Sequence, residues 1–386
     1  MHRIRPSVLL AGVLPVLALT GSASAVIAVL PVGSAVGSSV HTRQAASGRT
    51  ALRVLASTHY GAADNASGFS VIVTTRPGTA WALGGTNPGG TSSPVAERWN
   101  GRSLVPSPLP AGLSGFLTDA SAPGPADVWA ASRYGGYVLH WDGINWRLSR
   151  RWTSGEITGI TAVSRHDVWV FGTTVNGLPG TGTWHFNGRS WTEDTAGVAP
   201  YVYRASAVSR RDIWAIATDR GRFYVAHYDG RAWRRVRAGG VLAGVQLSDI
   251  LAVSSRDIWA VGNSETKRDG IRLVLAHYNG RRWVRIPTSL RAWAGRLAPA
   301  ARGSVLITAT PTDAESAGLI LRASAAGWAP AVLVRSGLGS GVSDAALDRK
   351  TGAVLASGGI LTRLGGNAVV WALPAPRPHR RDNDDT

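Results

Sequence analysis

The sequence predicts an all-β protein, a seven-bladed β-propeller whose blades are four-stranded antiparallel sheets. Three observations predict this fold. A motif of the form His-aromatic-(Asp or Asn)-Gly-x-x-Trp occurs at residues 140–146, 185–191, 227–233 and 277–283. A second motif, Asp-(Val or Ile)-Trp, precedes it each time and begins at residues 127, 167, 212 and 257. Weaker copies extend the pair to seven units spaced by 40 to 49 residues, and such a period indicates a repeat architecture.

The weaker copies lie on both sides of the four clear units. Unit 1 has "TAWALGG" before "RWNGRSL", unit 6 has "GSVLI" before "RASAAGW", and unit 7 has "GAVLA" before "RLGGNAV" (363–369). The first motifs of the seven units are centred on Trp81, Trp129, Trp169, Trp214, Trp259, Val305 and Val354.

Within one unit, residues 157–195, four short segments rich in Val, Ile, Trp and Thr are separated by turn residues. Residues 157–164, 168–173, 181–186 and 190–194 are therefore expected to be strands. Asn187-Gly188 separates the last two, and Asn-Gly between strands predicts a hairpin with a type I′ turn. Seven such sheets close radially and leave only short, protected edges.

The paired motifs resemble those of the kelch and galactose-oxidase-like propellers, and more closely the "DVWAVG…HWDGxxW" repeats of secreted bacterial propellers. The resemblance covers about residues 66–374 and implies a propeller without implying an activity. Only "WALGG" has the glycine pair that follows the second strand in kelch repeats, and the turn between the third and fourth strands is shorter. Galactose-oxidase chemistry is excluded because its cofactor requires a cysteine, which this chain lacks.

The N-terminal residues predict export. Arg3 and Arg5 precede an apolar run and the small residues Ala23 and Ala25, so residues 1–25 are expected to be a secretory signal peptide cleaved after Ala25. The alternative is an uncleaved membrane anchor, because a second apolar stretch follows. Residues 26–50 are expected to be an Ala/Ser/Gly-rich linker, residues 51–374 the propeller and residues 375–386 a disordered polar tail.

Two segments compete for the strand that closes the ring. Residues 51–57, "ALRVLAS", have the spacing of a fourth strand placed before unit 1, and would join the last blade. Residues 368–373, "AVVWAL", would instead give unit 7 a fourth strand of its own.

Composition limits the chemistry and suggests a partner. The chain of 386 residues has 41 Lys and Arg against 23 Asp and Glu, a net charge of +18, and Lys267 and Lys350 are its only lysines. Codon preference for arginine and attraction of polyanions both fit this excess. The absence of cysteine excludes a thiol nucleophile and any Cys-ligated metal site.

The residues that recur with the repeat are interpreted as structural. The four recurring histidines are expected to hydrogen-bond within their own blades, since equivalent positions of separate blades do not converge on one metal ion. The recurring aspartates are expected to bind the turn backbone. The tryptophans of the second strands are expected to lie between blades. The residues in question are His140, His185, His227, His277, Asp127, Asp167, Asp212 and Asp257.

No catalytic set, cofactor site or metal site is recognised. The five glutamates fall in no active-site motif, and no phosphate-binding glycine loop, serine elbow or HExxH occurs. Asp119, Asp249 and Asp344 lie near the first strand of three units and could face the central channel. A glycosidase needs two carboxylates that face one bond, so this route stays open.

Candidate binding residues are those without a repeat partner. On the loops between the second and third strands, and between blades, aromatic and arginine residues are candidates for recognition. They are Tyr134, Arg151, Trp152, Tyr201, Tyr203, Arg204, Arg291 and Trp293. A basic band on or after a fourth strand contains Arg234, Arg235 and Arg237.

These observations predict a secreted or envelope-associated, non-enzymatic binding or scaffold propeller. Guanidinium groups bind phosphate and carboxylate, so the expected partner is an anionic cell-wall polysaccharide or another envelope protein, and nucleic acid is not expected. A monomer is expected. The alternative is a secreted carbohydrate-active enzyme, a hydrolase or lyase, on the same scaffold.

Overall fold

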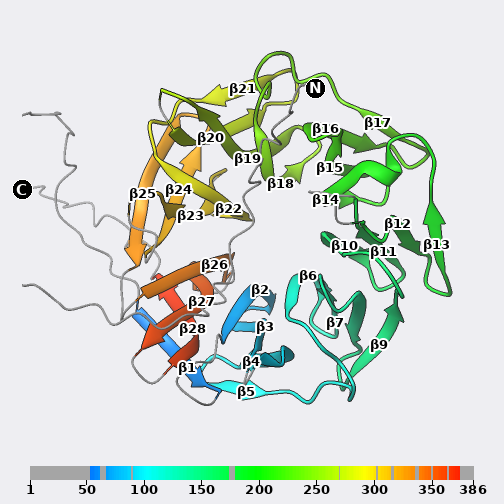
Figure 1. Ribbon diagram of the computed structural model, residues 1–386, viewed down its shortest axis with the longest axis vertical. Helices are drawn as coiled ribbons and strands as arrows, with labels where there is room; N and C mark the ends of the chain where they lie inside the picture. Colours follow the sequence, from blue (N-terminus) through cyan, green and yellow to red (C-terminus); the bar gives the residue numbers. More distant parts are fainter. Residues whose placement is uncertain are drawn as a thin grey trace, which may run out of the picture.

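The structure is a ring of seven four-stranded antiparallel sheets around a central axis, which confirms the predicted fold class (Figure 1). This computed structural model describes residues 53–60, 67–87, 90–173, 179–268, 270–300, 303–313, 317–334, 339–348, 351–362 and 365–373. The expected signal peptide, linker and tail lie outside the described residues. Within the described ranges, no helix has the length and apolar character needed to span a bilayer.

Each of the first six blades is built from four strands that are consecutive in the sequence, and the first of them lies nearest the axis (Figure 1). The strands of blade 1 are β2 (Gly68–Arg76), β3 (Thr79–Thr86), β4 (Ser93–Trp99) and β5 (Leu104–Pro106). Those of blade 2 are β6 (Leu117–Gly124), β7 (Asp127–Ser132), β8 (Tyr137–Trp141) and β9 (Trp146–Arg151). Those of blade 3 are β10 (Gly159–Ser164), β11 (Asp167–Phe171), β12 (Thr183–Phe186) and β13 (Trp191–Asp194).

Blades 4 to 6 follow the same order, and a short 3-10 turn (Ala199–Tyr201) precedes blade 4. The strands of blade 4 are β14 (Val202–Ser209), β15 (Asp212–Asp219), β16 (Arg222–Tyr228) and β17 (Trp233–Arg235). Those of blade 5 are β18 (Gln246–Ser254), β19 (Asp257–Thr266), β20 (Gly270–Tyr278) and β21 (Trp283–Ile286). Those of blade 6 are β22 (Ala292–Pro299), β23 (Val305–Pro311), β24 (Gly318–Ser324) and β25 (Gly327–Val334).

Blade 7 combines the two ends of the described chain. It consists of β26 (Gly339–Leu347), β27 (Val354–Thr362), β28 (Gly365–Leu373) and β1 (Arg53–His59), in that order. β1 pairs antiparallel with β28, with Thr58 opposite Ala368. The segment "AVVWAL" is therefore part of the third strand, and residues near 51–57 supply the fourth. The assignment of "RLGGNAV" to the hairpin between third and fourth strands is wrong, because this segment joins the second and third strands.

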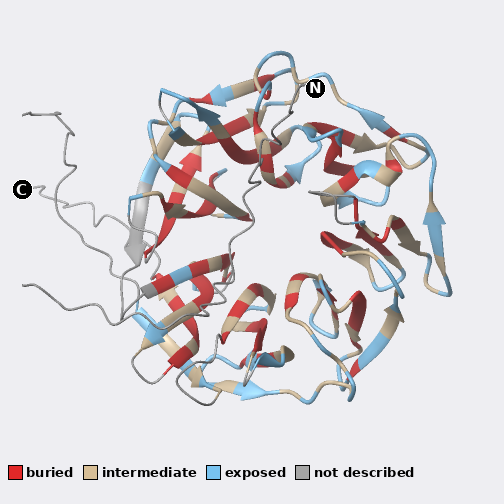
Figure 2. Ribbon diagram, in the orientation of Figure 1, coloured by how far each residue is buried: buried red, intermediate tan, exposed pale blue. Residues whose placement is uncertain are grey.

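The second strands of blades 1 to 5 are largely buried because neighbouring blades cover both of their faces (Figure 2). In β7, the five residues that follow Asp127 are all buried. In β15, six consecutive residues that follow Asp212 are buried. A strand covered on both faces is continuously apolar or small rather than alternating, as these sequences are.

Tryptophans of the second strands pack against the next blade, as predicted. The ring of Trp169 in blade 3 lies 5.0 Å from that of Tyr228 and 5.7 Å from that of Trp233, both in blade 4. Corresponding contacts with the following blade are made by Trp81, Trp129 and Trp214. These rings supply much of the apolar area that holds one blade against the next.

The recurring Asp, Trp and His form one triad in each of four blades. In blade 5, the Asp257 Oδ1 atom accepts a hydrogen bond from Trp259 Nε1 at 2.8 Å and lies 2.8 Å from His277 Nε2. The other triads are Asp127, Trp129, His140; Asp167, Trp169, His185; and Asp212, Trp214, His227. The histidines thus bond within their blades, as predicted. The expectation that these aspartates bind the turn backbone is wrong, because in blade 5 it is Ser254 Oγ that accepts the Arg256 N–H.

In blades 2 to 5 the third and fourth strands are joined by hairpins, but these are not of type I′. Gly188 has a φ of +94°, whereas Asn187 is not in the left-handed region. The Asn187 side-chain oxygen instead accepts the N–H groups of Arg189 and Ser190, each at 3.0 Å. In the part of the chain that the structure describes, the only non-glycine residue with a positive φ is Arg220, at +48°.

Candidate functional site

The strands nearest the axis are joined to the next blade by side chains. The Asp119 Oδ2 atom of blade 2 accepts the Ile160 N–H of blade 3 at 3.0 Å. Asp249 and Asp344 make the same bond to backbone N–H groups of β22 and β2, at 2.7 Å and 3.1 Å. Each of these aspartates follows an irregularity in the pairing of its strand, and such a bulge redirects a side chain. Each of the three carboxyl groups therefore joins its blade to the next one by a hydrogen bond.

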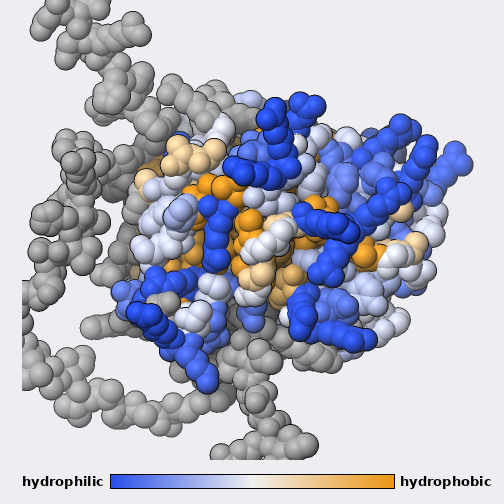
Figure 3. Space-filling model, turned by 90° about the horizontal axis from the view of Figure 1, so that it is seen from above, coloured by the Kyte–Doolittle hydropathy of each residue, from blue (hydrophilic) through white to orange (hydrophobic). Residues whose placement is uncertain are grey.

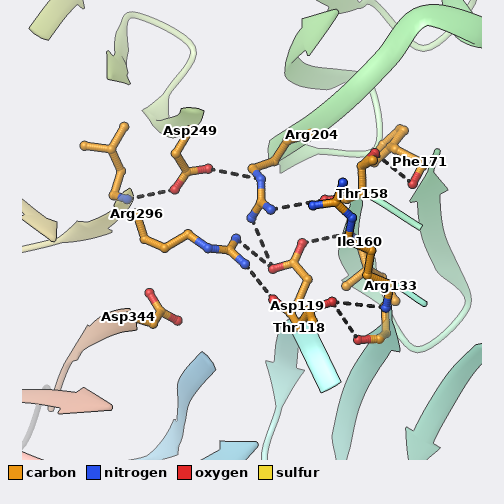
Figure 4. Close-up of polar contacts among 12 residues, drawn as sticks. Thr118, Asp119, Arg133, Thr158, Ile160, Phe171, Arg204, Asp249, Arg296 and Asp344 are labelled. Atoms are coloured by element: carbon orange, nitrogen blue, oxygen red, sulfur yellow. Dashed lines mark hydrogen bonds and ion pairs between the residues drawn. The ribbon is translucent and has the colours of Figure 1, made fainter. Parts of the chain in front are cut away.

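Two arginines extend this network across the axis (Figure 4). Arg296 of blade 6 reaches blade 2, where its Nη1 atom lies 2.9 Å from Asp119 Oδ1 and its Nη2 atom donates to the Thr118 carbonyl at 2.7 Å. Arg204 of blade 4 lies 3.4 Å from Asp119 Oδ1 and 3.7 Å from Asp249 Oδ1. Blades 2, 4, 5 and 6 thus meet in one buried ion-pair cluster.

The cluster pairs the carboxyl groups of Asp119 and Asp249 with two guanidinium groups, whereas Asp344 of blade 7 bonds to backbone N–H groups. Burial raises the pKa of Asp249 to about 7, against the opposing effect of Arg204. Burial also raises the pKa of Asp344 to about 7, although two backbone N–H groups stabilise its ionised form. Burial lowers the pKa of Arg204, but the nearby carboxylates outweigh this and hold it above its usual value. A carboxyl group with a pKa near 7 is partly protonated at neutral pH, because burial disfavours its charged form.

The ion-pair cluster contains Arg204, which was predicted to lie on a binding loop, and Arg296, which was not predicted to have a role. Arg204 lies on β14 and is paired in the channel, so its placement on a binding loop is wrong; an inner strand turns this side chain toward the axis. Arg296 was not anticipated from the sequence, although a charged residue inside an inner strand was an available signal. The carboxyl groups of Asp119, Asp249 and Asp344 are buried and already bonded. Their geometry fits a role in joining blades.

The remaining loop candidates are spread over several blades. Tyr134 and Tyr201 are 65% and 43% exposed, and Arg291 is also exposed. Arg151 is exposed too, but it is the last residue of β9, so its placement on a loop is wrong. Among the described residues, no hydrogen bond, ion pair or ring contact joins two of these candidates from different blades.

Three aromatic candidates are less accessible. Trp152 is partly buried, and its ring packs edge-on against those of Trp184 and Trp191, at 5.9 Å and 5.7 Å. Tyr203 and Trp293 lie on the inner strands β14 and β22 rather than on loops. The eight predicted residues therefore do not form one site.

Positive charge concentrates on blades 4 and 5. Residues 202–286 contain 16 Arg and Lys against 7 Asp and Glu, a net charge of +9. Residues 68–201 contain 9 against 8, a net charge of +1. The rim of the disc on the side of β17 and β21 carries long, projecting hydrophilic side chains (Figure 3).

The three arginines of the predicted band have different surroundings. The Arg234 Nη1 atom lies 2.5 Å from Asp229 Oδ2, so its charge is partly balanced. Arg235, next along β17, points to the opposite face of the sheet, where its guanidinium lies 4.4 Å from the centre of the Tyr224 ring. Arg237 follows the strand and is exposed. The band thus divides between the two faces of one blade.

The four recurring histidines belong to four different blades. In the described ranges, no three or more His, Asp or Glu side chains are placed to hold a metal ion. Each of the four histidines lies beside the aspartate of its own blade, as expected from the repeat.

No protein-family model and no curated protein matches the sequence. Solved propellers resemble the structure at low identity. The WD40 repeats of RRP9 are 12% identical, with a TM-score of 0.56 over 85% of this chain and 98% of that one. YCF48, solved with a D1 peptide bound, is 12% identical, with a TM-score of 0.53 over 84% and 98%. A chain of the mitotic checkpoint complex is 11% identical, with a TM-score of 0.53 over 86% and 99%. At such identity the likeness shows the β-propeller fold alone.

Proposed function

We propose that the chain is an exported, non-enzymatic binding propeller that holds an anionic polymer of the cell envelope on the outer edge of blades 4 and 5. The observation that carries this proposal is the local excess of positive charge, a net +9 over residues 202–286 against +1 over residues 68–201. Codon preference acts on a whole chain, so it does not account for the concentration of half of the net charge in two neighbouring blades.

The exposed arginines of these blades are suited to a polymer. Arg237 follows β17, Arg281 precedes β21 and Arg285 lies on it. All three are exposed and make no ion pair with a described carboxylate. β17 and β21 are the outermost strands of adjacent blades (Figure 1). Guanidinium groups bind phosphate and carboxylate through two parallel hydrogen bonds, so a long polyanion can engage both edges together.

Further support comes from the sequence and from the fold. The basic, apolar and small residues of 1–25 favour export, as does the resemblance of the repeats to those of secreted bacterial propellers. Similar propellers include one solved with a bound peptide and one within a multiprotein complex, so this scaffold is suited to binding. An acidic envelope protein is the other partner that the same edge would fit.

The test compares two triple variants that change the net charge equally. R237E/R281E/R285E alters the edge of blades 4 and 5, and its matched control alters exposed arginines of blades 1 and 3. The control is R102E/R165E/R189E. On a surface coated with a polymer of glycerol phosphate, the first variant is expected to bind at least about tenfold more weakly than wild type at low salt, and with a smaller salt dependence.

The control variant is expected to retain most of the wild-type affinity. An equal loss in both triple variants would show that only the total charge matters, and would overturn the assignment of binding to blades 4 and 5. If an acidic envelope protein binds instead of the polymer, and the two triple variants affect its binding in the same way, the partner is that protein and not a polymer.

A further inference from the structure

A polar cavity lies in blade 4, at the hairpin between its second and third strands. It has a volume of about 410 Å³ and is lined by Asp219, Arg220, Arg222, Tyr224 and Arg235. Asp219 and Arg222 face each other across the hairpin, and Arg222 and Tyr224, two residues apart on β16, share a face of the sheet. Arg235 reaches the same cavity from β17. Three guanidinium groups from three segments of one blade therefore line a single concave site.

The backbone at Arg220 is unusual. The hairpin turn is Arg220-Gly221, with φ angles of +48° and +75°, the pattern of a type I′ turn. Asn or Asp is the usual first residue of such a turn, because a longer side chain disfavours the left-handed region. Among the described residues, no other non-glycine residue has a positive φ. Arginine at this position costs stability, and its guanidinium lines the cavity.

The three guanidinium groups are available to a ligand. No carboxylate of the described residues lies within ion-pair distance of Arg220, Arg222 or Arg235. Arg133, at the corresponding hairpin of blade 2, differs because its Nε atom lies 2.7 Å from Glu156 Oε2 and forms an ion pair. Arg235 is oriented by its position 4.4 Å from the Tyr224 ring, a cation–π contact that reduces its freedom before binding.

The composition of the cavity indicates the class of ligand. Three arginines and one aspartate give a formal charge of +2, which a phosphate monoester, with a charge of about −2, balances and a single carboxylate does not. Asp219 is an acceptor that suits a hydroxyl group. The phenol of Tyr224 is neutral at neutral pH, as in an ordinary tyrosine, and burial raises its pKa further. A polyol or sugar phosphate carries both the dianion and the hydroxyl.

We propose that this blade 4 cavity binds the phosphate group of a polyol or sugar phosphate, with Arg220, Arg222 and Arg235 on the phosphate oxygens and Asp219 on a neighbouring hydroxyl. The site rests on the proposed function and deepens it: it is the point at which a phosphate-containing polymer, rather than a uronic one, is recognised. The exposed arginines of β21 then contact the rest of the polymer.

The test uses the full chain and the monomer glycerol phosphate, which is too small to reach blade 5. Its binding is measured by isothermal titration beside inorganic phosphate, sulfate and galacturonate at one ionic strength. Glycerol phosphate is expected to bind at least about tenfold more tightly than galacturonate, and more tightly than sulfate, which lacks the hydroxyl. Stronger binding of inorganic phosphate than of glycerol phosphate would assign the cavity to the free ion and overturn the proposal of an ester site.

Variants separate recognition from folding. R220N keeps a residue suited to the turn and removes the guanidinium, so it is expected to weaken glycerol phosphate binding at least about tenfold without lowering the melting temperature. R222Q is expected to act in the same direction. R189N, at an exposed turn of blade 3, is the matched control and is expected to bind as wild type does. Unchanged binding in R220N and R222Q would overturn the site.

Failure of this site and failure of the proposed function give different results. If the blade 4 cavity is not the phosphate site, R220N binds glycerol phosphate as wild type does, while R237E/R281E/R285E still loses affinity for the polymer. If the proposed function is wrong, the triple variant retains the polymer. If both proposals hold, the triple variant loses affinity for the polymer and keeps its affinity for the monomer.

Discussion

At the scale of single residues, position within the blade decides what an aspartate does. Asp257 at the start of a second strand holds a Trp and a His, whereas Asp344 on an inner strand accepts the N–H of Ile72 in the next blade. Asp229 in a hairpin accepts two backbone N–H groups. The period of the sequence identified the first kind, because those residues recur. The second kind depends on a bulge and on the neighbouring blade, neither of which has a local signature.

The channel cluster predicts an unusual dependence of stability on pH. The pKa of Asp344 is raised to about 7 in the folded state, above the unfolded value near 4, so the folded protein binds a proton first as the pH falls. The free energy of unfolding contributed by this group therefore rises between pH 8 and pH 5.5, by about 2 kcal/mol.

D344N should remove this contribution, because its amide oxygen still accepts the Ile72 N–H but carries no charge. Urea unfolding at several pH values measures the difference between wild type and variant. D313N, at an exposed position, is the control. The same pH profile in wild type and D344N would show that Asp344 has an ordinary pKa in the folded state.

At the scale of strands and hairpins, the sequence predicts most of the structure because each blade repeats one pattern. Alternating apolar segments and turn residues located the strands, and Trp spacing located the contacts between blades. Prediction failed where a strand pairs with a distant segment. The pattern of "AVVWAL" is that of an ordinary strand and does not give its position in the blade. It is the third strand of blade 7 because β1, from the other end of the described chain, pairs with its outer edge. The cavity residues Arg220, Arg222 and Tyr224 were missed because only pairing of β15 with β16 brings them together.

The packing between blades predicts a large loss for W214A. Trp214 is 7% exposed and lies against Tyr278 and Trp283 of the next blade, at 5.3 Å and 6.4 Å. Removing the ring leaves a cavity between blades 4 and 5, and should lower the free energy of unfolding by about 3 to 5 kcal/mol. Chemical denaturation measures it. An unchanged midpoint would mean that this contact between blades does not limit stability.

The turn at Arg220 predicts a stabilising substitution. Asn adopts the left-handed conformation more readily than Arg, so R220N should raise the free energy of unfolding by about 0.5 to 1 kcal/mol while it removes a guanidinium from the cavity. Thermal unfolding without ligand measures the first effect. A lower melting temperature would show that the Arg220 side chain stabilises the hairpin.

At the scale of the whole molecule, the ring is held by contacts at three radii. β1 closes the outer edge of blade 7, tryptophans pack between blades, and Arg296 joins blade 6 to blade 2 across the axis. The outer surface carries the other large-scale feature, the excess of positive charge on blades 4 and 5. The sequence predicted a basic band on or after a fourth strand, and the structure places its arginines on and after β17, the outermost strand of blade 4.

Loss of the cross-axis pair should destabilise the ring as a unit. R296M leaves Asp119 buried with one guanidinium fewer, and breaking a buried ion pair from one side costs about 3 to 5 kcal/mol. The double variant D119N/R296M removes both charges and should recover part of this loss. Differential scanning calorimetry compares the two. Equal destabilisation by the single and double variants would show that the ion pair itself contributes little.

Hydrogen–deuterium exchange of the full chain, with and without a polymer of glycerol phosphate, tests whether the outer edge of blades 4 and 5 is the binding surface. We expect slower exchange in the hairpin of β15 and β16, in β17 and in β21, and no change in blades 1 and 2. Protection confined to blades 1 to 3, or to the inner strands around Asp119 and Arg296, would contradict this expectation and would place the binding surface elsewhere on the ring.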